Sequence, residues 1–185
     1  TLTEGRPVFE RAVAVDGGDA DELLRLAASL DQGSEHPLAE AIVRAARDKG
    51  LALSKPEGFE SSSGIGVRGT VEGRALALGN AALMQQQGVD VAALRAQAEA
   101  LRGQGASVMH LAADGRLLGL LAVSDPVKAS TPEALRALQR AGLRVVMATG
   151  DGLTTARSVA TRLGIDEVHG EVQPADKLAL VQRLQ

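Results

Sequence analysis

The sequence predicts two structural units, an antiparallel α+β unit over residues 9–123 and part of an open α/β sheet over residues 124–185. In the first unit, short alternating segments are separated by hairpin-type turns at Glu72-Gly73 and Asp114-Gly115. In the second unit, predicted strands and helices alternate, which is typical of a parallel sheet with right-handed crossovers. A chain of 185 residues is long enough to bury one sizeable core or two small ones.

Hydrophobic periodicity and turn residues locate the elements of the first unit. Apolar residues at helical spacing predict helices, and alternating runs between glycines predict strands. Pro37 suits the first position of a helix because its missing N–H would be an unpaired donor there, and Asn80 is a good N-cap. The expected elements are a strand over 8–15, helices over 19–30 and 37–49, hairpin strands flanking Glu72-Gly73, helices over 80–87 and 91–102, and hairpin strands over 107–112 and 116–123.

The second unit is expected to begin with a helix that Thr131 and Pro132 open and that ends at Gly142. Leu143–Ala148, which is apolar except for Arg144, is expected to form a strand buried in a parallel sheet. The remaining expected elements are a helix over 153–163, a strand over 167–172 and a helix from 175 to the end.

Composition excludes several kinds of site. A net charge of -3 and a pI near 5.6 argue against a nucleic-acid-binding surface. The chain has no cysteine and three histidines, so we expect no disulfide and no structural zinc site, and we assign no metal ligands.

The longest apolar run, Leu117–Val123, is far shorter than the roughly 20 residues of a membrane helix, so we do not expect the chain itself to insert into a membrane. With two Phe and no Tyr or Trp, any ligand base must rest on glycine backbone, aliphatic groups or histidine.

Two features of the first unit suit a ligand site. His36 directly precedes Pro37 and is expected to cap the helix with its ring at the helix mouth, although capping alone would explain this position. The Gly64-Ile65-Gly66 loop lets a ligand approach the backbone and offers N–H groups to polar atoms, although a plain turn would have the same residues. The loop is not a dinucleotide-binding fingerprint because no helix follows it, and the chain has no Walker A sequence.

The second unit carries polar residues after its first predicted strand. Thr149-Gly150-Asp151 follows that strand, and ligands of open α/β sheets bind beyond the carboxyl ends of the strands. There, a threonine hydroxyl can donate to a phosphoryl oxygen and an aspartate can hold Mg²⁺ or a ribose. Asp151 would equally serve as the cap of the next helix. Lys177 is expected near the same sheet edge as a cation for phosphate, and an inert exposed lysine is the alternative.

The order of the motifs resembles the ATP-hydrolysing portion of heavy-metal-transporting P-type ATPases of the HP-motif class. The segments are, in order, SEHPLAEAIV, SGIGVRG, LGN, SDPVK, MATGDGLTTARSVATRLGI and EVQPADK, and the opening TLTEG is similar to the end of the family motif DKTGTLTEG. No lysine loop of the KGA type is present, which separates this class from calcium and sodium pumps. The resemblance implies an α+β antiparallel-sheet nucleotide-binding (N) domain with flanking helices over 9–123. It also implies a partial haloacid-dehalogenase-like phosphorylation (P) domain, with a Rossmann-like parallel sheet, over 1–8 and 124–185.

The resemblance also implies a role for each matched residue. His36 would contact or orient adenine with help from Glu35 and from Asp31, where the family usually has the longer Glu. The Gly64, Ile65 and Gly66 loop would line the nucleotide cleft. The remaining matches are Gly79 and Asn80 closing that cleft, Asp125 and Lys128 in the hinge between the domains, and Thr149, Asp151 and Lys177 handling the phosphoryl group and Mg²⁺.

ATP and Mg²⁺ are the cofactors that the resemblance implies. The implied partners are the remaining phosphorylation, actuator and transmembrane domains of a parent pump, with this chain at the cytoplasmic face of the membrane. Copper is the expected ion because copper exporters look most similar. The nucleophilic aspartate would precede Thr1 and the GDGxND magnesium motif would follow Gln185, so we expect ATP binding without a complete catalytic cycle. A phosphatase of the same superfamily with a cap domain, and a non-catalytic nucleotide-binding module, are the alternatives.

Overall fold

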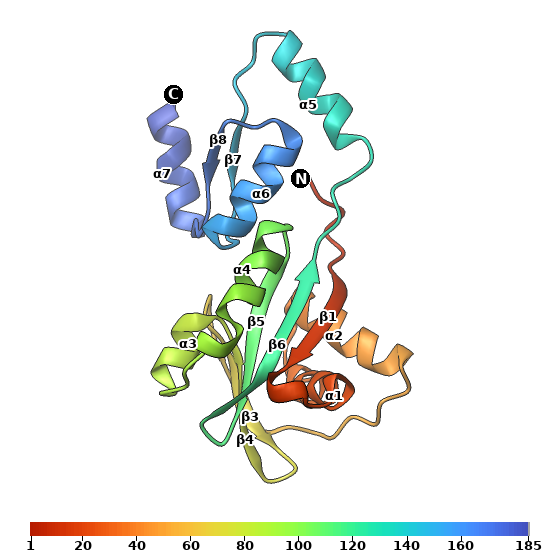
Figure 1. The fold of residues 1–185 in the computed structure, drawn as a ribbon. Helices are drawn as coiled ribbons and strands as arrows, with labels where there is room; N and C mark the ends of the chain where they lie inside the picture. Colours follow the sequence, from red (N-terminus) through yellow and green to blue (C-terminus); the bar gives the residue numbers. More distant parts are fainter. Residues whose placement is uncertain (185) are drawn as a thin grey trace.

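Figure 1 shows the computed structural model of the chain, which describes residues 1–184. A six-stranded antiparallel sheet with strand order β1-β6-β5-β4-β3-β2 forms the lower part, and a two-stranded parallel sheet forms the upper part. The strands of the larger sheet are β1 (Val8–Ala14), β2 (Glu57–Ser62), β3 (Gly66–Val71), β4 (Arg74–Gly79), β5 (Ser107–Ala113) and β6 (Arg116–Ser124). The predicted antiparallel α+β organisation of the first unit is therefore confirmed.

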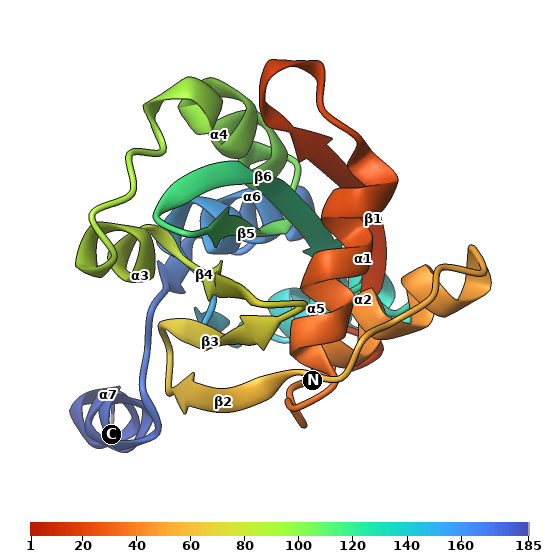
Figure 2. The same ribbon diagram turned by 90° about the horizontal axis from the view of Figure 1, so that it is seen from below.

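Helices cover both faces of the large sheet (Figure 2). Because side chains alternate along a strand, Leu76, Leu78 and Leu111 face α1 and α2, whereas Ala77 and Ala112 face α3 and its following turn. The two faces thus bury separate apolar clusters. The elements are the 3-10 turn η1 (Val15–Gly17), α1 (Ala20–Asp31), α2 (Pro37–Asp48), α3 (Ala81–Gln86), the 3-10 turn η2 (Ala92–Leu94) and α4 (Arg95–Gly103).

The two predicted hairpin turns are confirmed. Glu72 and Gly73 both have positive φ, at 53° and 75°, and Asp114 and Gly115 have φ of 49° and 77°. Two consecutive positive φ values are the mark of the tight turns whose twist matches antiparallel strands. The sequence did not predict β2 as a separate strand. Its pattern is mostly polar and exposed, and Gly58 at φ 57° sits within an irregular register against β3.

The upper part contains shorter strands than the sequence predicts. Strand β7 is paired in parallel with β8, but its residues are half-buried and Leu143 is 56% exposed, so the predicted buried strand over Leu143–Ala148 is wrong in both length and burial. Within residues 1–184, β7 has one neighbouring strand, β8. A parallel strand is buried along its whole length only when other elements cover both faces of its sheet. The elements are α5 (Thr131–Arg140), β7 (Val146–Ala148), α6 (Leu153–Leu163), β8 (Glu167–His169) and α7 (Pro174–Leu184).

Two further predictions are corrected. The strand predicted over 167–172 ends at His169, because the chain turns at Glu171, whose φ is 58°. The helix predicted over 91–102 is divided into η2 and α4, because Val91 and Leu94 have non-helical backbone angles. In residues 1–184, no helix combines the length and apolar character needed to cross a membrane.

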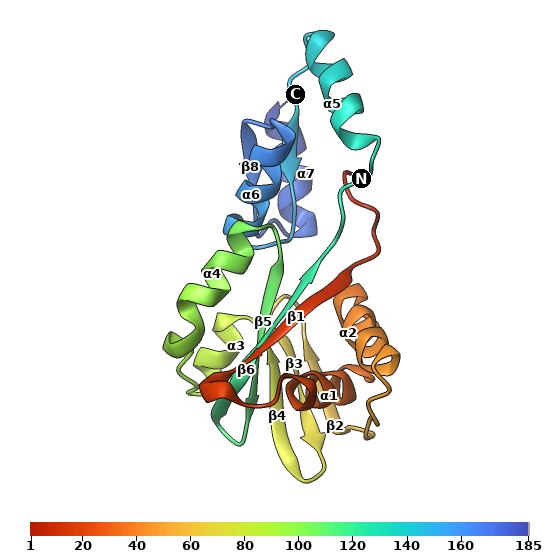
Figure 3. The ribbon, with the colours of Figure 1, turned by 45° about the vertical axis from the view of Figure 1, so that its right-hand side comes forward.

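Two antiparallel segments connect the lower and upper parts (Figure 3). Thr3 forms an isolated antiparallel bridge with Val127. The Asp125 carboxylate accepts hydrogen bonds from the backbone N–H groups of Gly5 and Arg6, each at 3.2 Å. The N–H of Lys128 donates to the carbonyl of Leu2 at 3.1 Å. Asp125 and Lys128, the predicted hinge residues, thus lie where the two connecting segments are held together.

His110 on β5 yields a prediction about acid stability. Its ring is 1% exposed, and neither ring nitrogen has a hydrogen-bond partner among the described residues. Burial, with a smaller contribution from the nearby Arg102 charge, lowers the pKa of His110 from 6.5 to about 4. The unfolded chain therefore binds this proton first, and the contribution of His110 to the free energy of unfolding should fall by about 3 kcal/mol as the pH drops from about 6.5 to 4.

His110→Leu removes this titration, so the difference in free energy of unfolding between His110→Leu and the original chain should grow in favour of His110→Leu by about 3 kcal/mol as the pH drops from about 6.5 to 4. Urea unfolding followed by far-ultraviolet circular dichroism between pH 4 and pH 8 measures the difference, and the lack of Trp and Tyr makes fluorescence unsuitable. Parallel pH curves for the two proteins would show that His110 does not titrate in this way.

Candidate functional site

A cavity of about 600 Å³ lies between the upper end of the large sheet and the loop that follows β7. This volume is in the range of small-molecule sites. The lining comes from the end of α1, the start of α2, the β2–β3 loop, the end of β4, the start of β5 and the β7–α6 loop. Segments from distant parts of the sequence therefore meet at one place.

Most of the sequence-predicted site residues meet in this cavity. The predicted residues that line it are Asp31, His36, Gly64, Ile65, Gly66, Gly79, Asn80, Thr149 and Asp151. Glu35 and Lys177 are exposed and are not among its lining residues. Lys177 lies in the first turn of α7, where its backbone N–H donates to the carbonyl of Gln173 at 3.1 Å.

His36 caps α2 as the sequence predicts, and its ring is also available to the cavity. The Nδ1 atom accepts a hydrogen bond from the N–H of Leu38 at 3.2 Å. A neutral imidazole that accepts through Nδ1 carries its proton on Nε2. His36 lines the cavity, so capping and ligand contact use different atoms of the same ring and do not compete.

The glycine wall of the cavity depends on a close approach between β3 and β4. Gly66 and Gly79 face each other in the ladder. A Cβ on Gly66 would lie 2.3 Å from the carbonyl oxygen of Leu78, and one on Gly79 would lie 2.3 Å from that of Ile65. Gly66 also has φ of 148°, a conformation that favours glycine. Any side chain at either position would force the two strands apart.

Asn80 braces the loop beside this wall. Its Nδ2 donates to the carbonyl of Gly64 at 2.9 Å, and its Oδ1 accepts from the N–H of Leu83 at 3.1 Å. The first bond fixes the β2–β3 loop, and the second is the predicted N-cap of α3. A Cβ on Gly64 would have no neighbour within 4 Å, so the backbone at this position faces open space.

Asp31 is a buried carboxylate at the edge of the cavity. The residue is 4% exposed, and its Oδ2 has no hydrogen-bond partner among the described residues. Burial raises the pKa of Asp31 to about 7, because the charged form loses its hydration. An unpaired buried acceptor is costly to the fold, and a ligand N–H donor would satisfy this one.

The Thr149–Gly152 loop forms the opposite end of the cavity. The Thr149 hydroxyl donates to Asp151 Oδ2 at 2.7 Å, and the Asp151 N–H donates to the Thr149 hydroxyl at 3.2 Å. The alternative of Asp151 as the helix cap is wrong, because Gly152 is the N-cap of α6 and no side chain caps it. Asp151 fits a Mg²⁺ ion that arrives with nucleotide phosphates, since Mg²⁺ is usually bound by one or two carboxylates together with phosphate oxygens.

Several contributors to the cavity were not predicted from sequence. Ser107 and Met109 come from the start of β5, and Ser34 precedes the His36 cap. The Ser107 hydroxyl is 3.5 Å from Asp151 Oδ1. Nothing in the local sequence shows this proximity, because it depends on how β5 and the β7–α6 loop meet. Ser34 could have been found, since its hydroxyl accepts from the N–H of His36 at 3.2 Å in a common local turn.

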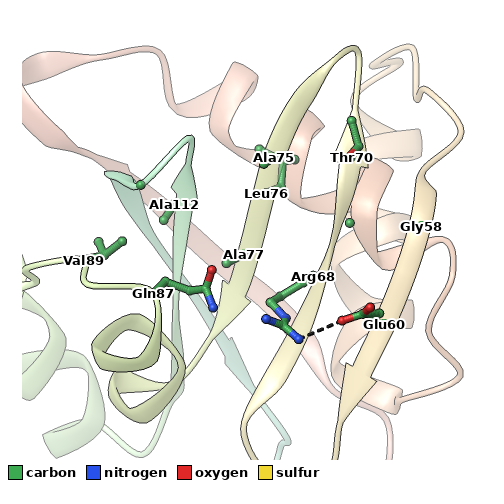
Figure 4. Close-up of a pocket in the computed structure, with 12 residues that line it drawn as sticks. Gly58, Glu60, Arg68, Thr70, Ala75, Leu76, Ala77, Gln87, Val89 and Ala112 are labelled. Carbon is green, nitrogen blue, oxygen red and sulfur yellow. Dashed lines mark hydrogen bonds and ion pairs between the residues drawn. The ribbon is translucent and has the colours of Figure 1, made fainter.

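A second, smaller cavity of about 260 Å³ lies over β2, β3 and β4 (Figure 4). The charged side chains that line it, Arg68 and Glu60, pair with each other at 2.7 Å. Much of the remaining lining is small, with Gly58, Ala75 and Ala77. With its charges already paired, this cavity offers a ligand fewer free groups than the cavity at His36.

The haloacid dehalogenase-like hydrolase family matches residues 1–185, the whole chain. The chain belongs to this family. In this chain, Thr149 and Asp151 follow the parallel strand β7 and line the cavity. Ligands of open α/β sheets bind at this end of the strands.

Relatives of this chain confirm its resemblance to heavy-metal-transporting P-type ATPases. A copper-exporting P-type ATPase of Legionella pneumophila is 51% identical over 184 residues, which are 100% of this chain and 25% of that protein. A silver exporting P-type ATPase of Salmonella typhimurium is 46% identical over 184 residues, 100% of this chain and 22% of that protein. The crystal structure of a zinc-transporting PIB-type ATPase in the E2.Pi state matches with a TM-score of 0.71 and 31% identity, over 100% of this chain and 30% of that one. The chain thus spans about a quarter of the length of these curated relatives.

Asp31 gives a testable consequence for stability. Because the folded-state pKa is about 7 against an ordinary value of 3.8, the unfolded chain ionises first as the pH rises. The contribution of Asp31 to the free energy of unfolding should therefore fall by about 4 kcal/mol between pH 4 and pH 7 and then level off. Asp31→Asn, which does not titrate, should lack this fall.

Urea unfolding of both proteins at the same series of pH values isolates the contribution, because all other titrating groups are common to them. If Asp31→Asn loses stability toward pH 7 as steeply as the original chain, the carboxyl is not held in its neutral form by burial.

Proposed function

We propose that this chain is the ATP-binding portion of a heavy-metal cation-transporting P-type ATPase. The observation that carries the proposal is the single cavity in which the predicted adenine-side residues, including His36 and Asp31, meet the predicted phosphoryl-side residues Thr149 and Asp151. An elongated ligand with a base at one end and phosphates at the other suits this arrangement. The similarity of the chain to copper and silver exporters over its full length supports the same function.

The base of ATP would lie at the α1–α2 end of the cavity. Nε2 of His36 can donate there, and the unpaired Oδ2 of Asp31 can accept from the adenine amino group. The glycines at 64 and 66 let the nucleotide lie against backbone rather than side chains. Glu35 would act from outside the cavity wall, and Gly79 with Asn80 would hold the loop that closes the site.

The phosphates would lie at the Thr149–Gly152 end. The Thr149 hydroxyl can turn from Asp151 to a phosphoryl oxygen, and Asp151 would hold the Mg²⁺ that neutralises phosphate charge during transfer. Lys177 lies outside the cavity lining. It would therefore supply a cation to the phosphates only after a movement of α7 or of the nucleotide. An aspartate elsewhere in the parent pump would accept the phosphoryl group.

We further propose that residues 9–123 form the N domain and that residues 1–8 and 124–185 belong to the P domain. Asp125 and Lys128 would form the hinge, where the paired connecting segments allow one part to move over the other. The remaining phosphorylation, actuator and transmembrane domains would be the partners in the pump, with this portion at the cytoplasmic face of the membrane. Copper is the transported ion that we propose, in line with the name of the Legionella relative.

A capped phosphatase of the same superfamily is the second candidate, because the family match alone would suit it. The two functions differ in what the first unit must do. A cap over a small phosphorylated substrate needs no adenine site, whereas a P-type ATPase does.

Replacing His36 tests the adenine site directly. His36→Ala should raise the dissociation constant for ATP about three- to tenfold, which corresponds to the loss of one hydrogen bond. Isothermal titration calorimetry with the 185-residue chain and ATP, with and without Mg²⁺, measures the change.

His36→Asn is the matched control, because asparagine keeps the N-cap of α2 but lacks the imidazole Nε2 donor. It should weaken ATP binding as much as alanine does, without alanine's loss of helix stability. Unaltered affinity in His36→Asn would remove His36 from the site, and no ATP binding by the original chain would favour the phosphatase.

A further inference from the structure

The lower and upper parts of the molecule also meet away from the connecting segments. Helix α6 lies above α4 and contacts it, and in Figures 1 and 3 the two helices are on the other side of the molecule from the two connecting segments. The contact is made by residues 103–107, which link α4 to β5 and are called here the docking turn. It meets the first two turns of α6, directly after the Thr149–Gly152 loop.

Two hydroxyl groups of α6 bind backbone carbonyls of the docking turn. The Thr155 hydroxyl donates to the carbonyl of Ala106 at 2.8 Å, and the Ser158 hydroxyl donates to that of Gly103 at 2.7 Å. Thr155 is 5% exposed and Ala106 is fully buried, so the first bond is shielded from water. Gly103 ends α4, where carbonyl groups lack partners within the helix. Ser158 therefore satisfies a carbonyl that the lower part cannot satisfy through its own helix.

The shape of the docking turn matches the surface of α6. Gly105 has φ of 94°, and a Cβ there would lie 2.5 Å from Nη2 of Arg162. Thr155 and Ser158 are three residues apart and so lie on the same face of the helix. The turn thus presents two carbonyls and a bare glycine backbone to α6, and the side chains of Val159 and Arg162 lie against that glycine.

This contact fixes the width of the cavity at its phosphoryl end. Ser107 follows Ala106 directly and lines the cavity, and its hydroxyl lies 3.5 Å from Asp151 Oδ1. Asp151 in turn lies one helical turn before Thr155. If the docking turn left α6, β5 would move away from Asp151, and the cavity would open at this end.

We propose that Thr155 and Ser158 are positioning residues that hold the nucleotide-binding part over the Thr149–Gly152 loop, so that the phosphates of ATP reach Asp151. They act through the position of the docking turn and touch neither the nucleotide nor the metal. The connecting segments at Asp125 act as the pivot, and the docking turn on α6 is the contact that closes. This assignment rests on the function proposed above.

Without the Thr155 hydroxyl, the buried carbonyl of Ala106 loses its donor, which costs free energy as long as the two parts stay in contact. When the docking turn leaves α6, water can bind this carbonyl, so the variant should favour the separated state. Thr155→Val keeps the shape of the side chain and removes the donor. Thr155→Ser keeps the donor, and Thr70→Val is a matched change at a half-buried threonine on β3, away from the docking turn. Ser158→Ala is the second test, at a half-buried site where folding is not at risk.

Distance measurement by double electron–electron resonance reads the effect directly. The chain has no cysteine, so spin labels at Gln86→Cys and Asp166→Cys, both exposed positions, report one distance between the two parts. The ratio of apposed to separated molecules should fall roughly 5- to 30-fold in Thr155→Val and in Ser158→Ala. Thr155→Ser and Thr70→Val should keep the original distribution.

Calorimetry with adenosine distinguishes this proposal from the proposed function. Thr155→Val should bind adenosine as the original chain does, because the base end of the cavity is unchanged. Unaltered distance distributions in both Thr155→Val and Ser158→Ala, or an equal shift in Thr70→Val, would overturn the positioning role while leaving ATP binding intact. Absence of adenosine and ATP binding in the original chain would instead overturn the nucleotide site on which the role rests.

Discussion

The close backbone approach of β3 and β4 at Gly66 and Gly79 is the constraint on which the candidate site depends. A Cβ at either position would lie 2.3 Å from a carbonyl oxygen of the facing strand, so the ladder can continue to the cavity edge only with glycine at both. The chain then passes directly to Asn80, which holds the Gly64 carbonyl and caps α3. One local feature therefore forms the cavity wall, orders the neighbouring loop and begins the next helix.

Two buried titratable groups of the lower part act on stability in opposite directions over the same pH range. Burial raises the pKa of Asp31 to about 7 and lowers that of His110 to about 4. Acidification therefore makes the contribution of Asp31 to the free energy of unfolding more favourable and that of His110 less favourable. Their surroundings differ in a way that bears on function. Asp31 lines the cavity, where a ligand donor can reach it, whereas the imidazole of His110 is enclosed on the face of the sheet that α4 covers.

Local sequence patterns predicted the parts of the fold that local chemistry determines. The His36 and Asn80 caps and the turns at Glu72 and Asp114 are all observed, because capping and positive φ depend on a few neighbouring residues. The length and burial of β7 were wrong, because they depend on which strands lie beside it. Ser107 beside Asp151, and the hydroxyls of Thr155 and Ser158 on the docking turn, could not be predicted, because they result from contacts between segments 44 to 55 residues apart.

The central claim is that a nucleotide occupies the cavity between His36 and Asp151. Backbone amide NMR of the 185-residue chain, titrated with a non-hydrolysable ATP analogue and Mg²⁺, tests it most directly. The largest chemical-shift changes should fall in Ser34, His36, Leu38 and Ala39 and in residues 61–67, 78–80 and 149–152, which line this cavity. Changes centred instead on Arg68, Thr70 and Gln87, around the second cavity in Figure 4, would contradict it.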